Sequence, residues 1–396
     1  MTVNPTERAA FDLDNTDPGL MQHLPETLRE MQARCPVAWS GASGGFWALT
    51  KYDDVFAASN DWETFTVTQG IMIPPTGASM PVIPAELDPP SHTKLRKLVL
   101  PAFTEKALQR WRPGLARIVE DAFRPVLPAG RADLVSDVAH PVPVLAICLL
   151  LGIDSDWRRI RELAANFLAA TGKPELARRR AQELESYLEE EIEARRGKPV
   201  EDLLGYYVNA VIDGAVIAPR ELLGLVQLMV VAGHETTVNG MGSMIYRLIV
   251  EPGLRERVLA DRSLIGPVID ETLRLHPPVW NMGRTVTGAT EVRGESLCPG
   301  EKVMLVYGAA NRDPEKFPDP DAFDLDRPGN NRHLTFGSGR HRCLGEPLAK
   351  LELRLALEYV LDHLPDVELD GEPQWGGGTN QHGLRSLPVR FTPSGG

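Results

Sequence analysis

The chain is poor in cysteine and contains no long apolar run. Its 396 residues include four cysteines, and no two of them form a Cys-x-x-Cys pair. A disulfide framework is therefore not expected in a chain of this size, which points to a reducing compartment. The most apolar stretches, 144–153 and 222–231, are too short to span a bilayer. The segment 1–20 lacks the basic and then apolar pattern of a signal peptide. We expect a cytoplasmic protein that does not enter the membrane.

Basic charge is also scarce. Lysine and arginine number 42 against 54 acidic residues, so the formal net charge is −12. Such a balance opposes non-specific binding to nucleic acid, and we expect no nucleic-acid partner, although a local basic patch remains compatible with it. Apolar residues make up 43% of the chain, which is ample for a large core. No linker is visible, so residues 1–396 are expected to form a single domain.

Helical periodicity dominates the middle of the chain, from about residue 91 to residue 276. Within it, the segment 175–197 is rich in both acidic and basic residues, which predicts an exposed amphipathic helix with ion pairs along it. The segment 219–250 is apolar on most faces and predicts a long helix buried in the centre of the protein. Residues 344–362 carry a leucine stripe and predict another helix.

Turn residues between short β-type runs predict a smaller β region. Glycines within 37–50 indicate a short hairpin, and Pro299–Gly300 separates two runs within 285–307, which indicates a second one. The tail from Gly376 indicates a third. Residues 66–90 form a long loop rich in proline and glycine, which is typical of a lid or a pocket wall. The sequence therefore predicts a mainly α fold with a smaller β region.

The stretch 336–345 (FGSGRHRCLG) places Cys343 between a glycine-rich loop and the start of a leucine-striped helix. The dipole and N–H groups of the helix N-terminus favour a thiolate there, as do the three cationic residues that precede the cysteine. Gly337 allows unusual backbone angles, and Gly345 lets the helix approach a flat ligand. A buried structural cysteine and the nucleophile of a hydrolase are two other interpretations. A dinucleotide fingerprint is excluded because Arg342 occupies the position of its third glycine.

The stretch 232–237 (AGHETT) lies inside the predicted helix 219–250. A carboxylate such as Glu235 is costly in a buried helix unless it has a function or a partner. Thr236 can donate a hydrogen bond to the carbonyl one turn back, which is a purely structural role. Alternatively, the small residues open room for a small molecule, to which Thr236 and Glu235 relay protons. A zinc-protease helix is excluded because Val238 stands where its second histidine is required.

Two further pairs have helical spacing. Glu271 and Arg274 lie one turn apart, which in isolation is a common surface ion pair. His92 and Arg96 place two cationic donors on one face of a helix that is expected to begin near Asp88, with a proline in its first turn. Such a pair can hold an anionic group or can simply be solvated.

Taken together and in this order, the four patterns resemble the cytochrome P450 family over residues 35–392. The stretch 336–345 resembles the family's haem-binding loop, and 232–237 resembles its oxygen-activation helix. Glu271 and Arg274 resemble its core ion pair, to which the stretch FDLDRP adds Arg327 as a third member. The resemblance implies the cytochrome P450 fold in a single haem-containing domain, 1–396. The oxygen-activation helix would span about 219–250, and the haem-ligand loop about 334–345.

The resemblance also implies a role for individual residues. Cys343 would ligate the iron of haem b as a thiolate, and Glu235 and Thr236 would be catalytic by delivering protons during oxygen activation. Glu271, Arg274 and Arg327 would be structural. Charge-assisted hydrogen bonds to the two haem propionates would come from His92, Arg96, Arg284 and His341. Further cofactor-binding residues would be Ala232, Phe336, Gly337 and Gly345.

A substrate pocket is implied in the same way. Most of its residues are apolar, so a hydrophobic, small-to-medium substrate is expected. Trp280 would narrow the space over the haem, stack on an aromatic substrate or point away into the core. Asn281 would be the single polar contact. The implied pocket residues are Met72, Ile73, Ile83, Val231, Val279, Trp280, Asn281 and Leu384.

The implied reaction is insertion of one oxygen atom from O2 into the substrate, with two electrons from NAD(P)H. The sequence holds no second cysteine cluster and no flavin module, so a separate ferredoxin and its NAD(P)H-dependent reductase are expected to supply the electrons. A monomer is expected. The docking surface would contain Lys94, Lys97, Arg340, Arg342 and Lys350.

Three alternatives to the oxygenase were considered. A peroxide-using haem-thiolate enzyme and a non-catalytic haem-binding sensor or carrier have no need of the pair Glu235 and Thr236. A cysteine hydrolase predicts no chromophore.

Overall fold

The computed structural model describes residues 10–76, 81–154, 157–170, 173–200 and 202–393. These residues form two compact units, each assembled from segments that are distant in sequence. Unit 1 contains 10–75, 250–343 and 374–385, and unit 2 contains the other described residues. Among the described helices, none combines the length and the apolar character needed to cross a bilayer.

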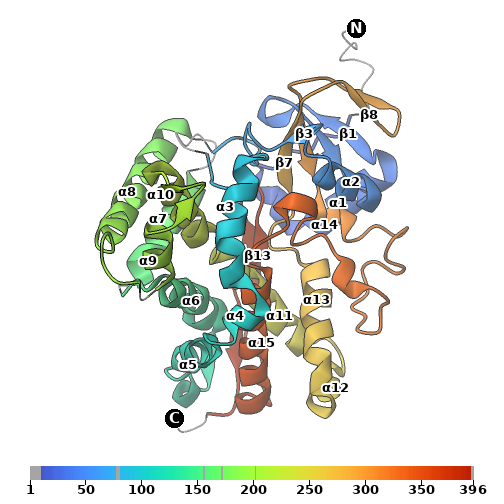
Figure 1. Cartoon of the computed structure of the whole chain (residues 1–396). Coiled ribbons are helices and arrows are strands. Elements are labelled where there is room, and N and C mark those ends of the chain that lie inside the picture. Colours follow the sequence, from blue (N-terminus) through green and yellow to red (C-terminus); the bar gives the residue numbers. More distant parts are fainter. Residues whose placement is uncertain (1–9, 77–80, 155–156, 171–172, 201, 394–396) are drawn as a thin grey trace. The chain divides into compact units, whose positions relative to one another are not determined.

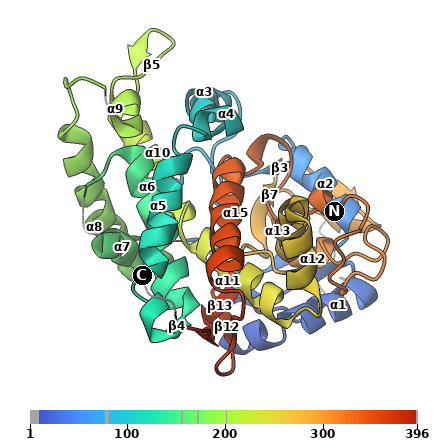
Figure 2. The same cartoon turned by 90° about the horizontal axis from the view of Figure 1, so that it is seen from below.

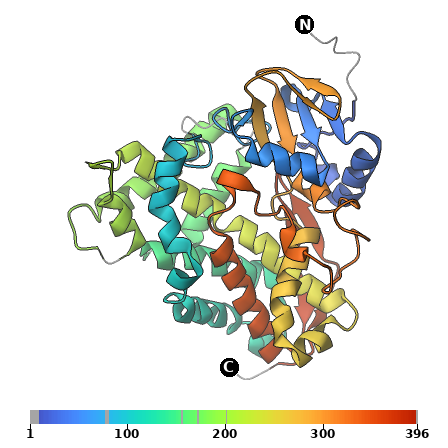
Figure 3. The same cartoon turned by 45° about the vertical axis from the view of Figure 1, so that its right-hand side comes forward.

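A five-stranded sheet lies at the centre of unit 1. Its strand order is β1-β2-β10-β7-β3, so strands from the start of the chain lie beside strands from residues 282–305, as the blue and orange arrows of Figures 1 and 3 show. The antiparallel pair β1–β2 confirms the hairpin predicted at 37–50, whereas β10 runs parallel to β2 and antiparallel to β7. The strands are β1 (Val37–Ser40), β2 (Phe46–Leu49), β3 (Phe65–Thr66), β7 (Met282–Val286) and β10 (Lys302–Leu305).

Side-chain alternation along β2 explains why this sheet is covered on both faces. Trp47 and Leu49 belong to one buried apolar cluster, and Phe46 and Ala48 belong to another. Successive side chains of a strand point to opposite faces, so the run FWAL supplies both clusters at once. The first cluster includes residues of α2 (Tyr52–Asn60) and the second includes residues of α1 (Leu24–Arg34), and Figure 1 shows both helices beside the strands.

The hairpin predicted around Pro299–Gly300 is wrong, because the two strands of the hairpin in this segment both lie before that turn. The strands β8 (Thr290–Val292) and β9 (Glu295–Leu297) pair around Arg293 and Gly294, whose φ angles are +49° and +85°. Two successive residues with positive φ close a two-residue hairpin, which explains the position of the turn. Pro299–Gly300 instead leads into β10. The predicted tail hairpin is confirmed as the pair β12 (Gln374–Gly377) and β13 (His382–Ser386).

Unit 1 also contains three α-helices within its second segment, 250–343. They are α12 (Leu254–Ala260), α13 (Ile265–Leu275) and the short α14 (Tyr307–Ala310). Between α14 and Cys343 the described chain contains no strand and only two short turns of 3-10 helix. These helices and the irregular segment position the candidate site in unit 1.

Helices dominate unit 2, which confirms the prediction of a mainly α protein. α6 is apolar all round and nine of its eleven residues are buried, and its neighbours α5 and α7 lie beside it in Figure 2. The small β elements are a three-stranded sheet of β4 (Arg131–Asp133), β11 (Glu368–Leu369) and β14 (Pro388–Arg390), and a hairpin of β5 (Val211–Ile212) and β6 (Ala215–Val216). The helices are α3 (Ser91–Val99), α4 (Glu105–Leu108), α5 (Arg112–Phe123), α6 (Pro141–Leu151), α7 (Trp157–Ala169), α8 (Pro174–Glu193), α9 (Leu203–Val208), α10 (Pro219–Ala232), α11 (Glu235–Val250) and α15 (Glu346–His363).

The charged segment forms α8 as predicted. Its exposed side carries pairs such as Arg180 with Glu183 at 2.6 Å and Arg179 with the same carboxylate at 3.2 Å. Leu184 and Leu188 are buried on its other side. The helix is therefore amphipathic, and its apolar stripe holds it on the core of unit 2.

The predicted helix 219–250 is divided in the structure. α10 ends at Ala232 and α11 begins at Glu235, with a turn at Gly233 and His234. The Thr236 hydroxyl donates to the Ala232 carbonyl at 2.9 Å, and the Thr237 hydroxyl donates to the Gly233 carbonyl at 3.5 Å. Both hydroxyls take carbonyls that backbone N–H groups would bind in a continuous helix, which is a known cause of helix opening.

Candidate functional site

Cys343 ends a tightly folded loop in unit 1. Its N–H donates to the carbonyl of Phe336 at 2.7 Å, which closes the loop on itself. Gly337 and Gly339 have φ angles of +69° and +67°, which favour glycine. A Cβ at Gly339 would lie 2.8 Å from the Oδ1 atom of Asn60, so glycine also permits close approach to α2. The loop therefore needs its glycines for backbone conformation and for packing.

The four cysteines differ in exposure, and none of them forms a disulfide. Cys343 is exposed, Cys148 is buried, and Cys35 and Cys298 are half-buried. Burial and, to a smaller extent, the charge of Glu191 raise the pKa of the Cys148 thiol to about 12. That residue stays a neutral thiol at neutral pH. The cysteine singled out by its motif is thus also the most accessible one.

A buried ionic cluster lies beside the segment that leads to this loop. Glu271 on α13 accepts two hydrogen bonds from Arg274, at 2.8 and 2.7 Å, and one from Arg327 at 3.1 Å. The N–H of Asp324 adds a fourth at 3.1 Å. Burial raises the pKa of Glu271, but the two arginines and this N–H outweigh it, so its pKa is lowered overall. The structure thus brings together the three residues assigned to the core ion pair.

The same cluster holds the irregular segment in place. Arg274 donates to the carbonyls of Asn311, Pro320 and Ala322 at 2.9, 2.7 and 3.0 Å. The side chain of Asn311 accepts a hydrogen bond from the N–H of Leu334 at 2.6 Å. It also donates one to the hydroxyl of Thr335 at 2.8 Å. Since these bonds anchor both ends of the segment to α13, they determine where the loop of Cys343 begins.

Arg284 on β7 provides a test of whether unit 1 suits an anionic cofactor. Its side chain is only 4% exposed, yet within the described structure its guanidinium donates only to the carbonyl of Gly283, at 2.8 Å. A buried guanidinium without a carboxylate is costly, and a planar anionic group satisfies it well. His341 is half-buried in the same unit. In unit 2, the buried His92 and the half-buried Arg96 lie one turn apart on α3, which begins at Ser91, later than predicted.

The break between α10 and α11 carries the candidate catalytic pair. Ala232 is exposed although Val230 and Val231 are buried, so one position of an apolar helix is accessible. The Thr236 hydroxyl donates its proton to the Ala232 carbonyl, and its oxygen can still accept a hydrogen bond. The Glu235 side chain is 12% exposed. The break thus holds an alcohol and a carboxyl at adjacent positions.

From the sequence, His234 was interpreted as an ordinary surface or core histidine without a functional role, and the structure places it against the candidate acid. Its Nε2 atom lies 3.5 Å from Oε2 of Glu235, and its Nδ1 atom lies 3.4 Å from the carbonyl of Val230. Burial lowers the pKa of His234, and Glu235 opposes this by a smaller amount. The available signal was a polar residue inside an apolar helix, directly before a carboxylate.

The implied pocket residues of unit 1 mostly pack against, or form hydrogen bonds with, other residues of the same unit. Trp280 is fully buried in the cluster that contains Leu28 and Ile73, which is the core orientation considered among the alternatives. Asn281 donates to the carbonyl of Thr379 at 2.9 Å. Met72 is buried and its sulfur accepts from Asn380, Leu384 is buried, and Val279 forms a β-bridge with Gln381. These contacts join the segment after α13 to the tail hairpin.

In unit 2, the implied pocket residues lie on α10. Ile83 packs on this helix at Gly224, where a Cβ would approach its side chain to 3.0 Å. Val231 is buried one residue before the exposed Ala232. The glycine therefore lets the proline-rich loop approach α10 two turns before the helix ends.

Several cations of the expected docking surface have intramolecular partners. Lys94 pairs with Asp213 at 2.5 Å, and Lys350 pairs with Glu346 at 3.2 Å. The guanidinium of Arg340 lies 5.7 Å from the ring centre of Trp62. Lys97 and Arg342 are exposed. The surface is therefore less positive than its count of cations suggests.

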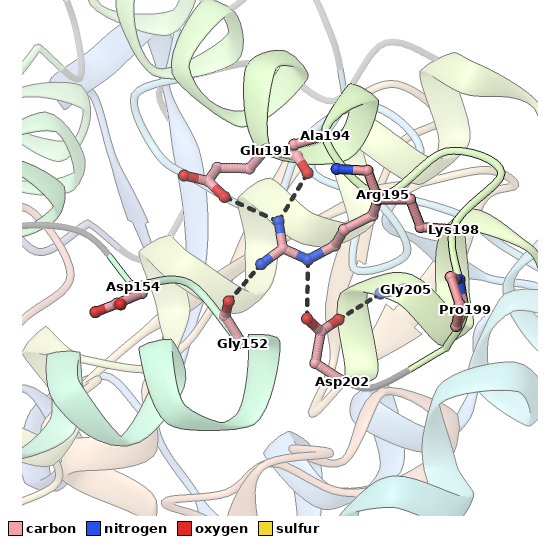
Figure 4. Close-up of a pocket in the computed structure, with 9 residues that line it drawn as sticks. All are labelled: Gly152, Asp154, Glu191, Ala194, Arg195, Lys198, Pro199, Asp202 and Gly205. Carbon is pink, nitrogen blue, oxygen red and sulfur yellow. Dashed lines mark hydrogen bonds and ion pairs between the residues drawn. The ribbon is translucent and has the colours of Figure 1, made fainter.

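A polar cavity of about 390 Å³ lies elsewhere in unit 2 (Figure 4). Arg195 crosses it and donates to Glu191 at 2.9 Å, to Asp202 at 3.0 Å and to the Gly152 carbonyl. Asp202 also caps α9 through the N–H of Gly205 at 2.6 Å. These bonds join the ends of α6, α8 and α9. None of the predicted site residues lines this cavity, and its arginine is paired with two carboxylates.

Comparison with known proteins adds independent evidence. A family model described as cytochrome P450 matches residues 169–373. Cytochrome P450 107B1 of Saccharopolyspora erythraea is 36% identical over 364 residues, which cover 87% of this chain and 89% of that protein. The cyclomarin C epoxidase CymV of Salinispora arenicola is 34% identical over 379 residues, covering 92% and 95%.

Solved structures show the same relationship. The cytochrome P450 PksS of the bacillaene polyketide synthase of Bacillus subtilis 168 aligns with a TM-score of 0.88 at 30% identity, covering 96% of this chain and all of that one, 100%. Further relatives are named as a cytochrome P450 monooxygenase and as a hydroxylase. The chain therefore belongs to the cytochrome P450 family, and it is a haem-thiolate monooxygenase with the fold of that family.

Proposed function

We propose that this monooxygenase inserts one oxygen atom from O2 into a hydrophobic, small-to-medium organic substrate. A separate ferredoxin and NAD(P)H-dependent ferredoxin reductase supply the electrons. The observation that carries the proposal is Cys343, the exposed cysteine on a glycine-shaped loop just before α15. Relatives named as an epoxidase and as a hydroxylase support the reaction type.

Cys343 is the proposed iron ligand. The positive end of the α15 dipole and the cationic residues before the cysteine favour its thiolate form. Arg284, His341, His92 and Arg96 are proposed to bind the propionates, and the uncompensated guanidinium of Arg284 supports this assignment. When bound, the haem supplies oxygen-activation chemistry that no side chain provides. Residues proposed to line it are Ala232, Phe336, Gly337 and Gly345.

Glu235 and Thr236 are the proposed proton-delivering pair. The Thr236 oxygen is held by its bond to the Ala232 carbonyl and can still accept a hydrogen bond. Glu235, next to it, is the proposed proton source. A general acid placed in this way contributes on the order of 10² to 10⁴ to a rate.

We also propose that residues 1–396 act as one haem-containing domain, as the family to which the chain belongs implies. The proposed substrate is hydrophobic because the accessible position at Ala232 lies among apolar residues. We also propose a cytoplasmic monomer, and the four free cysteines support a reducing location.

The proposed ferredoxin docks through exposed cations such as Lys97 and Arg342, with Lys94 available when it leaves Asp213. Docking of this kind responds to local potential and weakens with salt. Neutralising Lys94 and Arg342 together should flatten the salt dependence of haem reduction by an acidic ferredoxin. An unchanged salt dependence would count against this surface.

The absorption spectrum of the reduced protein, with and without carbon monoxide, tests the assignment of Cys343. A strongly red-shifted Soret band that depends on this residue establishes thiolate ligation by it. A coloured protein whose band lacks that shift would remove the role of Cys343. Turnover with peroxide alone, but not with O2 and an electron-transfer system, would favour the peroxide-using alternative over proton delivery by Glu235 and Thr236.

A further inference from the structure

His234 is a buried polar residue that the proposed function leaves without a role. Its side chain is 2% exposed, and it lies in the turn between α10 and α11. Ile147 of α6 packs against the preceding Gly233, so the surroundings on that side are apolar. The charged groups that act on the ring are Glu235, next to it in the chain, and Arg161 of α7. Burial lowers the pKa of His234, so the ring is neutral at neutral pH.

The carbonyl of Val230 favours one of the two neutral tautomers of the ring. A neutral imidazole has one N–H donor and one lone-pair acceptor. The carbonyl oxygen can only accept, and it lies 3.4 Å from Nδ1. This contact favours the tautomer with the proton on Nδ1 and the lone pair on Nε2.

The lone pair of Nε2 faces Glu235. Oε2 of that carboxyl is 3.5 Å away, a separation that a small side-chain rotation shortens to a hydrogen bond. Nε2 has no hydrogen-bond partner elsewhere in the part of the chain that the structure describes. An ionised carboxylate would present negative charge to a lone pair, whereas a carboxylic acid donates its proton to it. With a neutral ring protonated on Nδ1, the acid form of Glu235 is the form that satisfies Nε2.

We propose that His234 is a positioning residue that holds Glu235 as a carboxylic acid, with the acid proton directed at Nε2 of the imidazole. The inference rests on the proposed role of Glu235 as a proton source. When the proton leaves Oε2, the remaining carboxylate faces the lone pair and is destabilised. It takes a new proton from water, and the acid is restored. His234 therefore keeps the proton source loaded between turnovers.

Infrared spectroscopy of the haem-loaded protein tests this directly. At neutral pH the protein should show the C=O band of a protonated carboxyl, and this band should be absent from Glu235→Gln. His234→Asn and His234→Gln form a matched pair, since asparagine reaches only the position of Nδ1 and glutamine reaches that of Nε2. The band should be lost in His234→Asn and retained in His234→Gln. A band equal to that of the natural chain in His234→Asn, or absent from the natural chain, overturns the proposal.

A second measurement keeps the proposal falsifiable when the His234 variants do not fold. In the carbon-monoxide-bound reduced protein, ¹⁵N NMR reports the tautomer of each histidine. The His234 signal is the one that moves most in Glu235→Gln, and it should show a neutral ring protonated on Nδ1. A ring protonated on Nε2, or a charged ring, overturns the proposal. The red-shifted Soret band must be retained in every variant compared, as evidence of intact haem binding.

Oxygen-dependent oxidation of NADH with a surrogate ferredoxin system separates this inference from the function beneath it. Glu235→Gln should slow that oxidation. Where it does, and the band is unchanged in His234→Asn, only the role of His234 fails. Where Glu235→Gln leaves the rate unchanged, the proton-delivery role of Glu235 fails, and the inference built on it fails with it.

Discussion

Two buried polar sites are treated in opposite ways: the ionic cluster around Glu271 in unit 1, and the polar groups of α11 and of the helix break before it in unit 2. In unit 1, Glu271 accepts four hydrogen bonds, and Arg274 donates to three further carbonyls. In unit 2, both amide atoms of Asn239 and the hydroxyl of Ser243 are buried on α11 without a hydrogen-bond partner among the described residues, as is Nε2 of His234. Fully bonded buried ions hold a backbone in one position, whereas unsatisfied polar groups are available to new partners.

This difference suits what each of the two sites is proposed to do. A metal ligand works best on a stiff support that sets its position, and the cluster around Glu271 anchors the segment before Cys343. Proton delivery needs groups whose hydrogen bonds can be exchanged, and the break between α10 and α11 supplies them. The predictions below test each side of the comparison.

The largest effect is expected at the ligand itself. Cys343→Ser should abolish the red-shifted Soret band of the reduced carbon monoxide complex and reduce monooxygenase turnover below detection, because an alcohol does not replace a thiolate donor. Cys298→Ser, at a half-buried cysteine, should leave both unchanged. Retention of the band in Cys343→Ser would show that the ligand lies elsewhere.

Breaking the buried cluster should cost the most stability. Arg274→Met leaves the Glu271 carboxylate with one arginine in place of two, and should lower the free energy of unfolding by roughly 3–5 kcal/mol. Urea unfolding of the haem-loaded protein measures the loss. Arg34→Met removes an exposed pair with Glu30 and should cost about 0.5 kcal/mol or less. Similar losses in the two variants would contradict a special role for burial.

At the helix break, the yield of product per electron pair should depend on the hydroxyl of Thr236 and not on that of Thr237. Thr236→Val should lower product formed per electron pair by on the order of 10², with peroxide released in its place, because it removes a proton-delivering group. Simultaneous measurement of NADH consumed, product and peroxide gives this ratio. Thr237→Val removes only the weaker 3.5 Å contact with the Gly233 carbonyl and serves as the matched control. Equal uncoupling in both would assign the effect to helix geometry.

The smallest expected effect is a pH dependence of the contribution that Glu271 makes to the free energy of unfolding. The pKa of Glu271 is lowered in the folded protein, so its contribution is fully present above the unfolded value of about 4.5. The contribution is lost as the pH falls through the lower, folded value, by about 1.4 kcal/mol for each pKa unit of difference. The stability advantage over Glu271→Gln in urea should therefore shrink below about pH 4.5. A constant advantage down to lower pH would argue against ionic pairing.

Much of the site was visible in the sequence because its parts are local. The loop around Cys343 is ten contiguous residues, and AGHETT is six. Glu271 and Arg274 share a helix face by spacing alone. Arg327, which is distant in sequence, was assigned only through the family resemblance, and the structure brings it to the same carboxylate.

Local spacing could not reveal the partners that side chains find across the fold. Trp280 had three possible orientations, and packing against Leu28 selected the core. Lys94 was assigned to a docking surface, but its nearest partner is Asp213 in a hairpin that lies more than a hundred positions later. Likewise, β10 pairs with β7, which is distant in sequence, and not with the strand just before the turn at Pro299–Gly300.

The sequence by itself determined the chemistry of the proposed ligand loop and of the acid–alcohol pair, because each is a short motif whose residues are neighbours. Only the tertiary structure decided the division of the helix at Gly233, the core position of Trp280 and the contact of His234 with Glu235. The physical reason is that a sequence pattern specifies which groups share a face. Burial and the competition for hydrogen-bond partners then decide which neighbour each group binds.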